Sequence, residues 1–179
     1  MSTKNVLAEL QIPLERDLFL RTLISELAGT LEDVVGFDDA AGYISLVGQN
    51  IGEWINNLYT RKLAVDTLSA PQVIDALLDL KFRIQGDFFV IEQDENKVIL
   101  GNTACPFTDK VVGRPSMCMI TSNIFGVIIA ENLGYAKVIL QETIAQGHKG
   151  CRVKVYLKPS PEANTDDGRE YFGTARGSH

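Results

Sequence analysis

One segment of the chain is apolar on nearly every side, and this restricts the folds that the rest can adopt. Residues 120–130 fit a helix that begins after Pro115, with Ser116 as its N-cap, and ends at Gly134. A helix that is apolar all around is stable only when other elements cover it. The longest uninterrupted apolar stretch, Ile124 to Ala130, is too short to cross a bilayer. We therefore expect this helix to lie buried at the centre of one domain.

Flanking segments supply the elements that would cover this helix. Apolar residues recur at helical spacing in three N-terminal stretches, and the capping box Ser69–Gln72 announces the third. Residues 87–93 and 97–100 instead alternate with a period of two around a turn, as do residues 136–144 and 151–157. The order ααα-ββ-α-ββ predicts a single α+β domain with an antiparallel sheet covered by helices.

Each of the first two helices carries one apolar stripe, which predicts the face that it buries. The first stripe comprises Leu20, Leu23, Ile24, Leu27, Leu31, Val34 and Val35. The second comprises Ala40, Ile44, Val47, Ile51, Trp54, Ile55 and Leu58. On the second helix, Gly48 and Gly52 would let another backbone approach closely, either inside the chain or at a dimer seam.

The last expected strand has one face for the core and one for water. The core set is Cys151, Val153, Val155 and Leu157, and the wetted set is Arg152, Lys154, Tyr156 and Lys158. Beyond the strand, residues 159–179 are mostly polar, so we expect a flexible, disordered tail. With residues 1–13 as a flexible N-terminus, the domain spans residues 14–158.

Composition narrows the class of protein. The formal net charge is −6, and no basic stripe is available for nucleic acid, so we expect no direct nucleic-acid partner. The chain is 45% hydrophobic and 22% charged, as in ordinary globular proteins. The start shows no secretory segment, and the three cysteines form no disulfide framework. We therefore expect a cytoplasmic protein without a membrane partner.

The three cysteines lie at the ends of expected elements. Cys105 precedes the central helix, Cys118 lies in its first turn, and Cys151 begins the last strand. A packed sheet and helix could bring all three to one edge. The helix dipole would favour a Cys118 thiolate, which suits a metal ligand or a redox thiol. Alternatively, the cysteines are small apolar side chains that fill the core.

A family resemblance rests on the residues around these cysteines. Cys105-Pro106-Phe107, residues 115–118 and residues 147–153 resemble the methanogen output domain family, over roughly residues 14–158. That family is related to the 4-vinyl-reductase-type domains of bacterial and archaeal regulators, which bind small molecules. The resemblance implies a 4-vinyl-reductase-like fold and a sensory or output role.

The same resemblance implies a partial zinc site. In the 4-vinyl-reductase relatives, a helix Cys, a strand Glu, a further Cys and a final Cys hold structural zinc. Cys118 and Cys151 match the first and last of these positions. Thr143 stands at the middle Cys position, and Glu142 lies two residues from the Glu position.

Cys105 offers a third thiol in another arrangement. The spacing of the three cysteines also looks like that of iron–sulfur-sensing regulators, although their fourth Cys is missing. Three thiolates could bind zinc or an iron–sulfur cluster, with Glu142 or His148 as the fourth ligand. Haem would need His148 or a cysteine as axial ligand, and we do not expect it.

Aromatic side chains could line an apolar ligand pocket between the helices and the sheet. The candidates are Trp54, Tyr59, Phe88, Phe89 and Phe125. Aromatic residues at these spacings could equally fill the core.

Taken together, these patterns favour a regulatory domain over an enzyme, and we assign no catalytic residue. The domain would bind a small apolar ligand, a metal or both. It would signal as a homodimer or to a protein partner through its first two helices. The alternative is a thiol- or cluster-based redox enzyme or carrier that uses Cys105 and Cys118. A third possibility is a structural interaction module.

Overall fold

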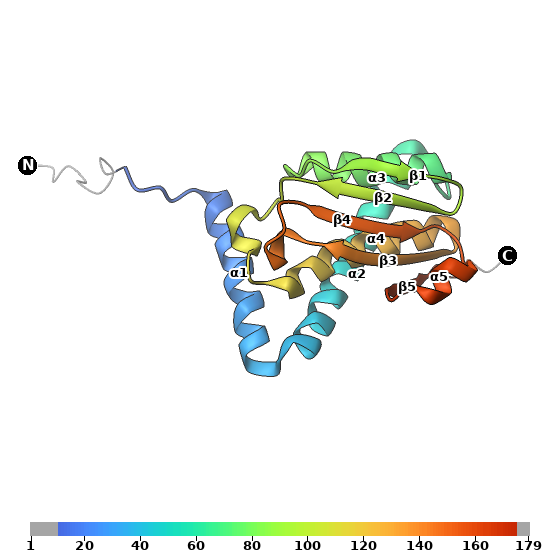
Figure 1. Cartoon of the computed structure of the whole chain (residues 1–179). Coiled ribbons are helices and arrows are strands. Elements are labelled where there is room, and N and C mark those ends of the chain that lie inside the picture. The colour runs from blue at the N-terminus through green and yellow to red at the C-terminus, as the bar shows by residue number, and fades with distance from the viewer. Residues whose placement is uncertain (1–10, 175–179) are drawn as a thin grey trace, which may run out of the picture.

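The computed structural model of the chain describes residues 11–174, and Figure 1 shows their arrangement. The helices are α1 (Arg16–Val35), α2 (Phe37–Leu63), α3 (Ala70–Arg83), α4 (Cys118–Leu133) and α5 (Pro161–Thr165). The strands are β1 (Phe89–Gln93), β2 (Lys97–Asn102), β3 (Tyr135–Glu142), β4 (Cys151–Tyr156) and β5 (Arg169–Phe172). Short 3-10 turns are η2 (Thr108–Val111), η3 (Pro115–Met117) and η4 (Ile144–Gln146).

All five strands form one antiparallel sheet in the order β1-β2-β4-β3-β5. The expected α+β class and the order ααα-ββ-α-ββ are confirmed, and α5 and β5 follow. The third helix begins at the expected capping box, where Ser69 and Gln72 bond reciprocally. At one edge, every residue of β1 is exposed, and its pairing with β2 is interrupted by a bulge between Val90 and Glu92.

Helix α4 lies at the centre of the domain, as its apolar composition predicted. It packs on one side against α2 and on another against β3 and β5. Phe125, Ile128 and Ile129 are completely buried in the main core. Pro115–Leu133 is long and apolar enough to cross a membrane, but most of this segment is buried inside the domain. The expected N-cap, Ser116, lies instead in η3, and its buried hydroxyl has no hydrogen-bond partner among residues 11–174.

The close contact between α2 and α4 depends on two glycines. A Cβ on Gly48 would lie 2.8 Å from the Cβ of Asn123, and one on Gly52 would lie 3.0 Å from the Cβ of Val127. These glycines therefore admit a neighbouring helix of the same chain. The alternative, a dimer seam at these residues, is wrong because α4 already occupies the space.

The segment after Pro159, expected to be a flexible tail, folds back onto the sheet. Strand β5 pairs with β3, and Tyr171 reaches the core, where its hydroxyl lies 3.0 Å from the Ser122 hydroxyl. Helix α5 is capped by Ser160, whose hydroxyl accepts a hydrogen bond from the Ala163 amide at 3.0 Å. The prediction of a disordered tail was wrong because α5 and β5 are short and bury few residues, so the segment is polar although it is folded. Residues 1–10 and 175–179 lie outside the described part.

Helix α5 also changes the outer face of the sheet. The Lys137 ammonium donates to the Ala163 carbonyl at 2.8 Å, and the Lys154 ammonium pairs with Asp166 at 2.8 Å. Tyr156, expected to face water, is completely buried because this segment covers it. The core set of the same strand is as expected, with Val153, Val155 and Leu157 buried.

The contact at Gly48 and Gly52 allows the packing of α2 against α4 to be tested. Gly48→Ala should lower the free energy of unfolding by about 1–3 kcal/mol, since the added methyl group overpacks the contact with Asn123. Gly42→Ala on the same helix should instead raise it by about 0.5–1 kcal/mol, because its Cβ would meet open space. Urea unfolding of both variants measures the difference. Equal effects would contradict the close-packing interpretation.

Candidate functional site

A cavity of about 90 Å³ lies between α3, the beginning of α4 and the core face of the sheet. Its apolar wall includes Ile84, Phe88, Val111, Met117, Ile120, Ile124, Leu140 and Val153. Its polar atoms come from Lys81, Asn102, Thr121 and Thr143, and all three cysteines line it. The cavity therefore joins residues from two helices, α3 and α4, and three strands, β2, β3 and β4.

The three cysteines converge on this cavity because of one buried amide. Asn102, at the end of β2, pairs with Cys151 at the start of β4. Its side-chain oxygen accepts from the Cys151 amide at 2.9 Å, while its nitrogen donates to the Ala104 carbonyl at 3.0 Å. Asn102 thus holds the loop that carries Cys105 beside the strand that carries Cys151, and Cys118 enters from α4. All three thiols are free and partly buried.

Burial keeps these thiols protonated. It raises the pKa of Cys105 and of Cys151, and it raises the pKa of Cys118 to about 12. For Cys118, the neighbouring Cys151 adds to the effect of burial. Cys118 does begin α4, as expected, but burial raises its pKa rather than leaving the thiolate favoured. The site therefore contains neutral thiols rather than a reactive thiolate.

Lys81 is a functional candidate that the sequence analysis missed. Its side chain is only 3% exposed, and its ammonium donates to Thr121 Oγ1 at 2.8 Å. The nitrogen lies 5.0 Å from the ring centre of Phe88 and 5.1 Å from that of Phe125. Burial lowers the pKa of Lys81 to about 8, against the opposing influence of the three thiols. The available signal was its position, four residues after Leu77 on the apolar side of α3.

The candidate fourth ligands do not reach the cysteines. Glu142 is exposed at the end of β3, and His148 is exposed with its Nδ1 3.2 Å from the Thr143 carbonyl. Within residues 11–174, no group of three or more His, Cys, Asp or Glu side chains is placed to hold a metal ion. A buried ammonium in the same cavity also opposes a cation. As arranged here, these residues do not fit zinc or an iron–sulfur cluster.

The aromatic candidates divide into two groups. Phe88 lines the cavity, and Phe125 packs edge-on against it with ring centres 5.5 Å apart. Trp54 is 61% exposed and Phe89 is 47% exposed, so neither encloses a ligand. Tyr59 donates to Asp79 at 2.6 Å on the outside of α3. The structure brings only Phe88 and Phe125 to the site.

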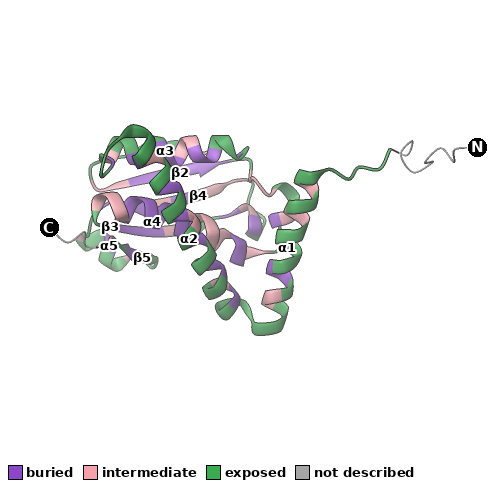
Figure 2. Ribbon diagram, turned by 180° about the vertical axis from the view of Figure 1, so that it is seen from behind, coloured by how far each residue is buried: buried purple, intermediate pink, exposed green. Residues whose placement is uncertain are grey.

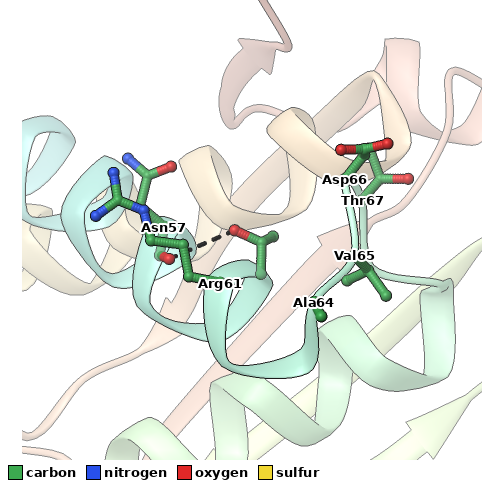
Figure 3. A pocket seen from close by; sticks show the side chains of 7 residues that line it. Asn57, Arg61, Ala64, Val65, Asp66 and Thr67 are labelled. Carbon is green, nitrogen blue, oxygen red and sulfur yellow. Dashed lines mark hydrogen bonds between the residues drawn. The ribbon is translucent and has the colours of Figure 1, made fainter.

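A second hollow lies at the end of α2 and is shown in Figure 3. It is wide, about 570 Å³, but open and largely polar, with Asn57, Arg61 and Asp66 among its lining residues. The dashed line in Figure 3 is the hydrogen bond that the Thr60 hydroxyl donates to the Asn57 carbonyl at 3.5 Å. It lacks the enclosure and the convergent cysteines of the cavity.

Comparison with models of protein families identifies the family of the chain. The family model of methanogen output domain 1 matches residues 23–156, which is most of the chain. The chain belongs to the methanogen output domain 1 family. This confirms the resemblance to the methanogen output domain family, and it indicates that the output domain has a regulatory role. A comparison with curated proteins finds no match.

Among solved structures, the output domain is similar to trafficking protein particle complex subunit 3 from Naegleria fowleri. The TM-score is 0.53 at 12% sequence identity, and the match covers 79% of this chain and 96% of the other. That protein is covalently bound to palmitic acid. At this identity the likeness concerns the fold alone.

The raised thiol pKa values predict slow alkylation. At pH 8, native Cys118 should react with iodoacetamide roughly a thousandfold more slowly than in the unfolded chain, because so little thiolate is present. Peptide-resolved mass spectrometry over a time course measures this rate. The protein unfolded in guanidinium serves as the control, since its three thiols should react alike. Fast labelling of native Cys118 would show that it is ionised.

Proposed function

We propose that the output domain is a regulatory module that binds a small, largely apolar molecule in the cysteine-lined cavity and signals as a homodimer. The observation that carries this proposal is the cavity itself, which gathers residues from α3, α4 and three strands. The proposal includes a relationship between the output domain and the 4-vinyl-reductase-type ligand-binding domains. The positions of Cys118 and Cys151 support this relationship. A cytoplasmic location is supported by the free thiols.

Size and lining suit a small ligand. A cavity of about 150 Å³ lined by apolar side chains holds benzene, so about 90 Å³ suits a somewhat smaller molecule. Polarizable thiols adapt well to apolar ligands. The Naegleria fowleri protein holds palmitic acid, but a long acyl chain would not fit here without enlarging the cavity. We therefore favour a compact ligand over a lipid.

The cavity is connected to α1 through its wall. Val111, Met117 and Phe107 line the cavity and also pack in one cluster with Ala28 of α1. Ser25 of α1 donates to the Lys110 carbonyl at 2.7 Å. A ligand that displaced these wall residues would therefore move the surface on which α1 rests. This gives ligand binding a physical route to the N-terminal helices.

The apolar stripe of α1 faces outward. The helix rests on the domain through small residues, Ser25, Ala28 and Gly29, which are buried. The stripe expected to be buried is instead mostly exposed, with Leu27 at 63% and Val34 at 75%, and Figure 2 shows α1 largely green. Helix α2 also exposes large apolar side chains, Leu46 and Trp54. An exposed apolar area of this extent marks an interaction site.

The spacing of the stripe identifies another helix as the occupant. Leu20, Ile24, Leu27, Leu31 and Val34 recur at alternating steps of four and three residues, the pattern of a coiled-coil seam. Leu31 is half-buried against the cluster that contains Ala28, and the other four are exposed. A second copy offers the same seam, and two-fold pairing would cover both at once. We therefore propose a homodimer through α1 and α2, whose changed packing a signalling partner would read.

The redox alternative draws less support. A thiol enzyme or carrier using Cys105 and Cys118 requires an accessible thiolate, whereas burial raises the pKa of both thiols. The regulatory proposal makes no such demand.

Filling the cavity tests ligand binding. Leu140→Trp should abolish binding of small organic molecules, because the indole would occupy the space behind Leu140. Ile139→Trp is the matched control, since this neighbour points to the opposite face of β3 and should leave binding unchanged. A panel of neutral and anionic small molecules, followed by ligand-observed NMR, measures the loss. Absence of any binder to the native protein, or equal binding to both variants, would contradict the proposal.

A charge within the α1 stripe tests the dimer. Leu27→Glu should convert a dimer into a folded monomer, because two carboxylates would meet in the seam while the exposed position keeps the monomer stable. Glu26→Lys, exposed on α1 beside the stripe, should leave the dimer intact. Light scattering coupled to size exclusion measures the mass. A monomeric native protein would overturn the proposal.

A further inference from the structure

The buried ammonium of Lys81 lacks an anionic partner. It lines the cavity, makes one hydrogen bond, to Thr121, and forms no ion pair within residues 11–174. An ammonium has three protons to donate, so two remain for other acceptors. Buried lysines are almost always paired. This unsatisfied donor therefore points to a ligand.

The surroundings of Lys81 stabilise its charge without neutralising it. The rings of Phe88 and Phe125 lie within cation–π distance of the nitrogen. The other titratable groups of the cavity, Cys105, Cys118 and Cys151, are held protonated by burial, which raises the pKa of each. The cavity thus has a positive end on α3 and neutral walls elsewhere.

Taking the cavity as the ligand site proposed above, we infer that its ligand is a small organic anion, a carboxylate joined to a short apolar body. The carboxylate would accept hydrogen bonds from the Lys81 ammonium and from the Thr121 hydroxyl. The apolar body would lie against Ile124, Leu140 and Val153, which line the remaining wall.

This class of ligand follows from two features together. A buried cation is costly unless an opposite charge is bound beside it, so an anion gains more here than a neutral molecule of the same shape. An inorganic anion would satisfy Lys81 but would leave the apolar wall uncovered. A carboxylate with a branched or linear body of a few carbons matches both the charge and the cavity of about 90 Å³.

Binding of paired probes tests the inference. Acetate and propionate should bind the native protein, and their amides, acetamide and propionamide, should bind at least about tenfold more weakly. In Lys81→Met, the acids should lose about tenfold or more in affinity and the amides should change little. Lys62→Met, at an exposed lysine of α2, is the matched control. Titration calorimetry at constant ionic strength gives these affinities.

A second variant covers the case in which Lys81→Met does not fold. Thr121→Val keeps the shape of the side chain and removes its hydroxyl, so it should weaken acid binding more than amide binding, because a hydrogen bond to a charged carboxylate is stronger than one to a neutral amide. Lys81→Met itself should raise the thermal midpoint of the ligand-free protein, because a methionine removes an uncompensated buried charge. A lower midpoint would indicate that Lys81 serves only the packing of α3, and it would overturn the inference.

The outcomes separate this inference from the proposed function. If neutral amides bind as well as the acids, the cavity is still a ligand site but the assigned ligand class is wrong. If chloride or sulfate binds as well as propionate, the requirement for an apolar body is wrong. If none of the probes and no molecule of the wider panel binds, both proposals are overturned.

Discussion

The burial of α4 on all its sides is the constraint on which the rest of the domain depends. Because α4 exposes almost no polar surface, it needs a helix on one side and a sheet on another, and Gly48 and Gly52 let α2 come close enough. The beginning of α4 then lies where the ends of β2 and β4 meet. The cavity forms at this junction, so the same packing that stabilises the fold also creates the candidate site.

The site and the outer surface are linked by elements of little regular structure. The loop and turns from Cys105 to Met117 form one wall of the cavity and also the surface against which α1 packs. Such segments shift more readily than a packed helix or a sheet. Under the proposed function, this segment would pass the state of the cavity to the apolar surface of α1 without unfolding of the core.

Much of the fold was predictable from the sequence. The apolar segment, the capping box at Ser69 and the changes of hydrophobic period placed four helices and four strands close to their observed limits. The C-terminal elements escaped prediction because α5 and β5 are short, with few buried residues each. The direction of the α1 stripe also escaped, since periodicity reports that a helix has an apolar face but not what covers it. The sequence analysis considered that the three cysteines could converge, and they do. It did not predict that Lys81 is buried, because this burial depends on Phe88 and Phe125, which come from other parts of the chain.

The two edges of the sheet differ, and this limits how the domain can assemble. On one side the edge strand is β5, which has only 4 residues and so offers a short run of unpaired backbone groups. On the other side β1 is free, but the bulge between Val90 and Glu92 breaks the regular run of donors and acceptors. An irregular edge is a poor template for a further strand. Growth by adding strand to strand is thereby disfavoured at both ends, which leaves assembly to the helices and favours a closed, finite complex over a fibre.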